Sequence, residues 1–224
     1  RCLSRGLGDV YKRQLASFED GSKTMIEMTA LANAINQPPD KIGMNGPVSS
    51  VSDLNKVLIP EVDGGVLSQS GRVDYAFGPA PGVFSIVKSD NPTVIEEMEY
   101  LSMGEGPYYT LYRPYHLASI EAPRSIGMAI INNEPGLQPK SWIAEVIGHA
   151  KKELKKGEKI DGIGGFATYG VTYPVANTDN LIPLGLLEGA TVVKEIKKGE
   201  PITKDSVDLP ENLINSLRKL QESS

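Results

Sequence analysis

A polar segment with two prolines, Asn132-Asn133-Glu134-Pro135-Gly136-Leu137-Gln138-Pro139, divides this chain into two parts of different composition. Proline and its polar neighbours interrupt regular elements, so such a segment is typical of a linker. Long helical patterns precede it, whereas several short strands without a long helix follow it. The sequence therefore predicts an α+β chain, with a mixed α/β domain over residues 15–139 and a small β-rich domain over residues 140–210. Apolar residues at helical spacing predict a terminal helix over residues 211–224.

The first residues are interpreted as foreign to the natural protein. Gly8-Asp9-Val10-Tyr11-Lys12-Arg13-Gln14 corresponds to a translated transposon end used in sequencing libraries, so residues 1–14 are expected to be a cloning or sequencing scar. Without its four basic residues and one acidic residue, the formal charge changes from −5 to −8. Cys2, the single cysteine, also lies in this segment, which excludes disulfides and zinc–cysteine sites from the rest. We expect the natural chain to continue upstream of Leu15.

The acidic balance and the lack of a long apolar run limit the partners of this chain. A net negative charge argues against nucleic acid and acidic membrane surfaces as partners. No apolar run approaches the roughly 20 residues that cross a bilayer. We therefore expect a cytoplasmic protein that acts on a small molecule.

Periodicity predicts the elements of the first part. Helical spacing, strand alternation and turn residues predict helices over 20–35, 51–59, 91–101 and 116–131, and strands over 72–77, 82–87 and 108–113. Residues 78–81, Gly-Pro-Ala-Pro, separate the first two strands, which are expected to form a hairpin.

The second part contains a near-repeat. Lys-Glu-Leu-Lys-Lys-Gly-Glu-Lys-Ile over 152–160 is followed 42 residues later by Lys-Glu-Ile-Lys-Lys-Gly-Glu-Pro-Ile over 194–202. Two copies are too few for a solenoid. The near-repeat predicts two equivalent turns of a compact β module.

The opening helix carries a possible catalytic group. Asp20, Lys23 and Glu27 fall at positions i, i+3 and i+7, which places two acids and an ammonium along one face. A lysine between carboxylates can donate a proton or hold a developing alkoxide. The alternative is structural: Asp20 caps the helix, and Lys23 with Glu27 forms a solvated pair.

A second candidate group lies in the aromatic segment 108–116. It contains Tyr109, Arg113 and His116 among further tyrosines. Arginine offers a planar fork for phosphate or carboxylate, and histidine can relay a proton or bind a metal. The alternative is an aromatic strand that packs in a core, with Arg113 extending to its rim.

Two further features have weaker functional interpretations. Asp161-Gly162-Ile163-Gly164-Gly165-Phe166 is rich in glycine, but a strand pattern follows it instead of a helix, so it is not a dinucleotide fingerprint. His149 lies beside a lysine-rich turn and is expected at the surface.

These motifs also resemble those of a known group, the homoserine-dehydrogenase-like oxidoreductases with a C-terminal SAF module, which include enzymes similar to type II deoxyxylulose phosphate reductoisomerase. The resemblance covers most of residues 17–208. Its carrying segments are Ser17-Phe18-Glu19-Asp20-Gly21-Ser22-Lys23, Gly43-Met44-Asn45-Gly46-Pro47, Gly104-Glu105-Gly106-Pro107-Tyr108-Tyr109, Tyr112-Arg113-Pro114-Tyr115-His116-Leu117 and Asp161-Gly162-Ile163-Gly164-Gly165.

The resemblance implies a Rossmann domain that this chain lacks, a substrate domain that supports dimer contacts, and a β-clip-like SAF domain. It implies NADP or NAD as cofactor, bound mainly by the missing domain, and Mg²⁺ or Mn²⁺ as a possible metal. By analogy, Lys23 and Asp20 would be catalytic. The substrate-binding residues would be Glu27, Asn45, Tyr109, Arg113 and His116.

Two hypotheses follow for the function. The first is the substrate-side half of an NAD(P)-dependent oxidoreductase, assembled as a homo-oligomer, that acts on a small hydroxy or oxo compound such as a ketose phosphate; alone, this fragment would be inactive. The alternative is a non-catalytic carbohydrate-binding protein of the SAF type, or a sugar-acid dehydratase that shares the SAF module.

Overall fold

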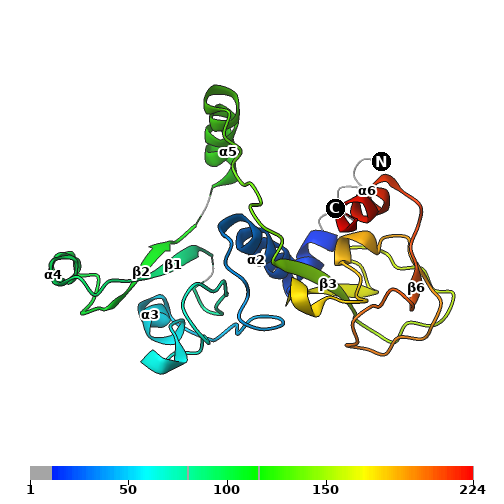
Figure 1. Ribbon diagram of the computed structural model, residues 1–224, viewed down its shortest axis with the longest axis horizontal. Helices are drawn as coiled ribbons and strands as arrows, with labels where there is room; N and C mark the ends of the chain where they lie inside the picture. Colours follow the sequence, from blue (N-terminus) through cyan, green and yellow to red (C-terminus); the bar gives the residue numbers. More distant parts are fainter. Residues whose placement is uncertain (1–11, 80, 116, 224) are drawn as a thin grey trace. The chain divides into compact units, whose positions relative to one another are not determined.

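The computed structural model describes residues 12–79, 81–115 and 117–223, and the chain divides into two compact units (Figure 1). Unit 1 combines Arg1–Gly43 with Ser141–Ser224, and unit 2 is Met44–Lys140. Unit 1 therefore joins the opening helix to the β-rich part of the chain, although unit 2 lies between them in the sequence.

All three sheets in the described residues are antiparallel strand pairs, β1–β2, β3–β4 and β5–β6. Unit 1 contains α2 (Ser22–Ile35), β3 (Ala144–Ala150), β4 (Thr168–Pro174), η4 (Val175–Asn177), η5 (Leu184–Leu186), β5 (Thr191–Val192), β6 (Val207–Asp208) and α6 (Leu213–Glu222). Unit 2 contains η1 (Val51–Asp53), α3 (Leu54–Val57), η2 (Glu61–Asp63), β1 (Val83–Lys88), α4 (Pro92–Tyr100), β2 (Tyr108–Arg113), α5 (Ala118–Gly127) and the π-helical turn η3 (Met128–Asn132). The α+β class is confirmed.

Helix α2 packs against β3 and β4 through small side chains. Ser22, Thr29 and Ala32 are buried on this face. The Gly170 amide donates to the Ser22 hydroxyl at 2.8 Å, and the Thr29 hydroxyl lies 3.1 Å from that of Thr172. Small residues let the helix approach the strands closely, which places its first turn beside the β-rich part.

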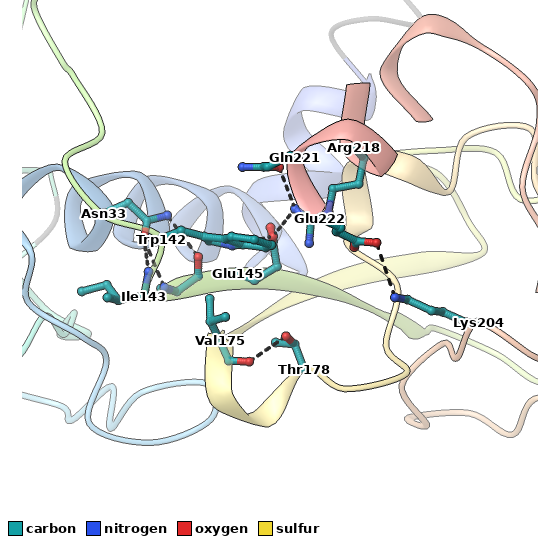
Figure 2. A network of polar contacts seen from close by, with 11 residues as sticks. Asn33, Trp142, Ile143, Glu145, Val175, Thr178, Lys204, Arg218, Gln221 and Glu222 are labelled. Atoms are coloured by element: carbon teal, nitrogen blue, oxygen red, sulfur yellow. Dashed lines mark hydrogen bonds and ion pairs between the residues drawn. The ribbon is translucent and has the colours of Figure 1, made fainter. Parts of the chain in front are cut away.

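Asn33 fastens the other end of α2 to the start of β3 (Figure 2). Its side-chain oxygen accepts from the amides of Ile143 and Ala144 at 2.9 and 3.0 Å. Its amide nitrogen donates to the Ala144 carbonyl at 3.0 Å. The Asn33 side chain thus makes three hydrogen bonds with the backbone at the point where the chain enters β3.

The two copies of the near-repeat pair with each other in antiparallel orientation. Leu154 and Ile196, at equivalent positions, exchange two backbone hydrogen bonds of 2.9 and 3.0 Å. The Gly157 amide donates to the Val192 carbonyl at 2.8 Å, and the equivalent Gly199 amide donates to the Ala150 carbonyl at 2.8 Å. The copies are therefore related by a local twofold relationship, which confirms that they are equivalent turns of one β module.

Unit 2 is organised by the antiparallel pair of β1 and β2, in which Val83 is opposite Arg113 and Lys88 is opposite Tyr108. A small core of Leu54, Leu58 and Leu67 packs beside this pair. The predicted hairpin between 72–77 and 82–87 is wrong, because β1 pairs with the later segment 108–113.

Segment 72–77 is not a strand, and Asp74 explains why. Its carboxylate accepts from the backbone amides of Asn45, Gly46 and Tyr75 at 2.8 to 3.1 Å. These bonds turn the segment toward the loop at 44–46, and Phe77 makes an isolated bridge with Val48. Alternating polarity in this segment therefore reflects loop contacts and not a pleated sheet.

The other predicted helices are present with shifted ends. Helices α2, α4 and α6 are confirmed, whereas the second predicted helix is split between η1 and α3. The helix predicted over 116–131 is α5 followed by η3, and His116 lies outside the described residues. Within the described ranges, every helix is too short or too polar to cross a membrane.

Candidate functional site

Asp20 covers the first turn of α2. Gly21 precedes the helix in the left-handed conformation, with φ of 79°, which glycine adopts without steric cost. This turn lets one Asp20 carboxylate oxygen accept from the Ser22 amide at 2.8 Å. Gly21 is therefore the N-cap residue, and Asp20 binds the first helical amide from one position earlier. Its second carboxylate oxygen is left for another contact.

That second oxygen lies 2.5 Å from the ammonium of Lys151. Both side chains are largely buried, at 15% exposure for Asp20 and 20% for Lys151. The contact is an ion pair without hydrogen-bond geometry to Asp20 Oδ2, and the Lys151 ammonium donates to the Gly165 carbonyl at 2.7 Å. Lys151 therefore joins the start of α2 to the glycine-rich loop.

Lys23, the predicted catalytic cation, has a more open setting than Lys151. Its ammonium lies 3.6 Å from Glu27 Oε1 and 3.8 Å from the ring centroid of Phe18. The Lys23 side chain is 35% exposed. Asp20, Lys23 and Glu27 thus belong to one helix start, but the ammonium closest to Asp20 is that of Lys151, which sequence reasoning missed.

The glycine-rich loop is closed by its own carboxylate. Asp161 accepts from the amides of Phe166 and Ala167 at 2.7 and 3.1 Å. Burial acts to raise the pKa of Asp161, but these amide donors outweigh it and hold the pKa below its usual value. A Cβ at Gly165 would collide with this carboxyl group. The amides of Gly165, Phe166 and Ala167 are already used within the loop, which leads into β4 and not into a helix, so it lacks the arrangement of a dinucleotide-binding turn.

A cavity of about 790 Å³ adjoins this polar group. Its lining includes Glu19, Asp20, Lys151, Asp161, Gly165 and Phe166, together with two residues of the expected scar, Lys12 and Arg13. A cavity of this volume accommodates a small metabolite. Carboxylate and ammonium groups beside it can bind polar substrate atoms and exchange protons with them.

His149 is buried in the β module, which corrects the expected surface position. Its Nδ1 lies 2.9 Å from the Gly199 carbonyl and its Nε2 lies 2.9 Å from the Tyr173 hydroxyl. Because a carbonyl only accepts, Nδ1 carries the proton and Nε2 accepts from Tyr173. Burial lowers the pKa of His149, although the Gly199 carbonyl opposes this effect. His149 therefore belongs to the buried core of the β module.

The remaining predicted site residues belong to unit 2, so the structure does not unite them with Asp20 and Lys23 in one unit. The Asn45 side chain donates to Asp74 at 2.9 Å and helps to hold the 44–46 loop. Tyr109 is fully buried, and its hydroxyl has no hydrogen-bond partner among the described residues. This burial favours the packing alternative for Tyr109.

Arg113 lies at the end of β2, where its guanidinium is more than half exposed and pairs with Glu121 of α5. This position agrees with an arginine at the rim of a core. His116, the other predicted substrate-binding residue, lies outside the described residues. Arg113 is therefore a cation of the aromatic segment that solvent can reach.

Unit 2 also holds a polar cluster that the sequence did not reveal. The Tyr108 hydroxyl donates to Asp63 Oδ2 at 2.5 Å, and the Lys88 ammonium lies 3.8 Å from the same oxygen. The hydrogen bond to Asp63 raises the pKa of Tyr108, with burial adding to the effect. Strand register places Lys88 opposite Tyr108, but Asp63 reaches them from η2, which no local pattern predicts.

The described ranges contain no group of three histidine, cysteine, aspartate or glutamate side chains that could hold a metal ion. The acidic side chains near the cavity already have other partners. Asp20 pairs with Lys151, Asp161 accepts from backbone amides, and Glu27 lies further along α2 beside Lys23. Metal binding at this site would therefore need further oxygen ligands from a substrate or from elsewhere.

Comparison with known proteins identifies two segments of the chain. Residues 7–122, over half of the chain, match the family described as oxidoreductase DRL, catalytic domain. Residues 136–208 match the SAF domain. No curated protein matches the chain. Asp20 and Lys23 lie in the first segment and Lys151 lies in the second.

Proposed function

Because this chain belongs to the DRL oxidoreductases and also carries a SAF domain, we propose that it is the substrate-side part of an NAD(P)-dependent oxidoreductase acting on a small hydroxy or oxo compound. The observation that carries the proposal is the largely buried ion pair of Asp20 and Lys151 beside a cavity of about 790 Å³. Lys23 follows Asp20 by three residues, in the first turn of α2. A ketose phosphate is one candidate substrate, because the family resemblance includes reductoisomerase-like enzymes.

Each polar residue of the α2 start has a role in this proposal. The Lys23 ammonium donates a hydrogen bond, and then a proton, to the substrate oxygen that becomes a hydroxyl. Asp20 orients the substrate hydroxyl, and its carboxylate takes up or returns the proton of that hydroxyl. Glu27, 3.6 Å from Lys23, limits the positions that the ammonium can occupy. Reversing the same proton transfers serves the oxidation direction.

The nicotinamide, when bound, supplies or accepts the hydride. Since the glycine-rich loop leads into a strand and not into a helix, the cofactor would be bound by residues other than this loop. The proposal includes a homo-oligomer and admits Mg²⁺ or Mn²⁺ as a helper of substrate binding. In unit 2, Arg113 is proposed to bind an anionic substrate group, with Asn45 and His116 as further candidate contacts and Tyr109 packed in the core beneath.

The test uses the full-length protein encoded by an intact copy of the gene. NADPH or NADH oxidation is measured with ketose phosphates and with aspartate semialdehyde, first in the wild type and then in Lys23→Ala. We expect the variant to lose about 100-fold or more in kcat/KM, because one proton donor to the reacting oxygen contributes at least that much. Lys41→Ala, an exposed lysine after the same helix, serves as control and should keep its turnover.

Two outcomes would contradict the proposal in different ways. Unchanged turnover in Lys23→Ala would remove Lys23 from the mechanism and leave the oxidoreductase assignment standing. Absence of nicotinamide oxidation or reduction with every carbonyl and hydroxy compound tested would overturn the proposed activity.

A further inference from the structure

Lys151 is held in place at both of its ends. Its backbone amide donates to the Ala167 carbonyl at 2.9 Å, directly after the last residue of β3. Its ammonium donates to the Gly165 carbonyl at 2.7 Å and lies 2.5 Å from Asp20 Oδ2. Because the side chain is also largely buried, its ammonium has little freedom to move away from Asp20.

The acceptor of Lys151, the Gly165 carbonyl, belongs to a loop with a fixed conformation. The Asp161 carboxylate accepts from the two backbone amides that follow Gly165. A Cβ at position 165 would collide with this carboxyl group, so the loop packs tightly at this point. The glycine-rich loop therefore sets the position of the Lys151 ammonium, which in turn lies against Asp20.

Stability alone does not explain the ion pair of Asp20 and Lys151. Helix α2 is already attached to β3 and β4 by the hydrogen bonds of Ser22, Thr29 and Asn33. Two charges that leave water lose hydration, and their mutual attraction recovers little more than this loss, so a buried ion pair is a weak source of stability. The pair instead lines the cavity of about 790 Å³, where the orientation of its charged groups matters.

The Asp20 carboxylate is fixed through both of its oxygens. The Ser22 amide donates to Oδ1 at 2.8 Å, and the Lys151 ammonium lies against Oδ2. A carboxylate with a neighbour at each oxygen keeps one orientation. Proton transfer to or from a substrate needs such a fixed geometry, to within about 0.5 Å.

We propose that Lys151 is the positioning residue of Asp20, which it holds in the orientation that takes up or returns the proton of the substrate hydroxyl. This inference rests on the proposed function, in which Asp20 is catalytic. Lys151 acts through Asp20, and its own ammonium neither gains nor loses a proton. The SAF segment, which supplies both Lys151 and the glycine-rich loop, thereby takes a direct part in turnover.

The first test measures kcat and KM of the full-length protein encoded by an intact copy of the gene. NADPH or NADH oxidation is followed with the ketose phosphate or with aspartate semialdehyde, whichever the wild type turns over. Lys151→Met should lower kcat on the order of 100-fold, as a misplacement of about 1 Å does, and should leave KM within about threefold. Lys152→Met, at the exposed neighbouring lysine that pairs with Glu158, is the matched control and should keep the wild-type kcat.

A second test separates positioning from a contribution to folding. Once Asp20→Asn has removed the carboxylate, adding Lys151→Met should change kcat by less than about threefold, because no carboxylate remains to be positioned. A lysine that only supported the fold would lower kcat by the same factor in both backgrounds. Circular dichroism of each variant verifies that the compared proteins are folded.

Chemical rescue provides a third test, which does not depend on how well Lys151→Met folds. In Lys151→Ala, added n-propylammonium has the length of the deleted part of the side chain and should raise kcat in a saturable manner. Tetramethylammonium carries the same charge without an N–H donor and should not raise it. Neither cation should affect Lys152→Ala.

The outcomes distinguish this inference from the proposed function. A wild type that turns over none of these compounds would overturn both. Wild-type turnover that Lys151→Met leaves unchanged would overturn the inference alone. So would equal losses of kcat with and without Asp20→Asn, or a Lys151→Ala variant that n-propylammonium does not activate, and the oxidoreductase assignment would then stand without Lys151.

Discussion

Asp20 of the catalytic segment and Lys151 of the SAF segment form the ion pair that links these two parts of the chain, with their charged atoms 2.5 Å apart. No local sequence pattern predicts this pair, because 130 residues lie between Asp20 and Lys151. The SAF segment therefore contributes a side chain to the surroundings of the proposed catalytic aspartate.

A double-mutant cycle should measure the coupling free energy between Asp20 and Lys151. Asp20→Asn and Lys151→Met should each destabilise the protein, and the double variant should lose less than their sum by about 1–3 kcal/mol, because both charges are largely buried. Urea unfolding at pH 7 measures the free energies. The exposed pair Lys152–Glu158 is the control and should show no measurable coupling. Additive effects for Asp20 and Lys151 would refute the coupling.

The two equivalent residues of the near-repeat should be equally important for stability. Leu154→Ala and Ile196→Ala should each lower the free energy of unfolding by about 2–5 kcal/mol, because both side chains are buried at the centre of the paired copies. Chemical denaturation provides the measurement. Lys155→Ala, the exposed neighbour on the same turn, should change stability by no more than about 0.5 kcal/mol. A large loss in one copy and none in the other would contradict the twofold relationship.

His149 should make stability fall in mildly acidic solution. Its pKa in the folded protein is lowered by burial, so between the ordinary value of 6.5 and the folded value the unfolded chain binds a proton that the folded chain does not. Stability is then full above about pH 6.5 and declines as the pH falls, by at most about 1.4 kcal/mol per pH unit.

Denaturation of the wild type and of His149→Gln at pH 7.5, 6.5 and 5.5 measures this decline. The variant should be less stable at pH 7.5 because it disturbs the contacts to Gly199 and Tyr173, but it should have a flatter profile over this range. Parallel profiles would show that His149 is not the titrating group.

Tyr108 should titrate above the ordinary tyrosine value of 10.0, because its hydroxyl donates to Asp63. A raised folded pKa means that this stabilisation is present below pH 10 and is lost as the pH rises through the folded value. Tyr108→Phe should cost about 1 kcal/mol at pH 7, a value reduced for the partial exposure of Asp63. Ultraviolet titration of the phenolate band should lose one of the components that titrate above pH 10.0 in this variant. An unchanged titration curve would contradict the assignment.

Local elements of the fold could be predicted, and pairings between distant elements could not. The apolar spacing of 20–35 and of the terminal helix depends only on neighbouring residues, so both helices were predictable. The strand that pairs with 82–87 was not predictable, because two segments were possible partners. The carboxylate of Asp74 holds one of them, 72–77, in loop contacts, and β1 pairs with 108–113. Alternation in a sequence does not distinguish a pleated strand from a loop with regularly spaced anchors.

The same limit applies to the candidate site. Spacing along one helix predicted Asp20, Lys23 and Glu27 as neighbours. The structure has the Lys23–Glu27 pair, whereas Asp20 precedes α2 and pairs with Lys151. Lys151 was not predicted because no pattern in its own segment indicates a contact with Asp20. His149 was misplaced because its lysine-rich neighbourhood suggested a surface, whereas β3 is buried at every residue from Val146 to Ala150.

The discontinuity of unit 1 has a consequence for how the protein is made. Helix α2 leaves the ribosome before roughly a hundred residues of unit 2, and its partners β3 and β4 follow only after them. At ordinary translation speeds the helix waits on the order of 10 s with Met25 and Ala32 uncovered. Unit 2 can close on its own contacts during that interval, so synthesis favours folding the inserted unit first and completing the enclosing one last.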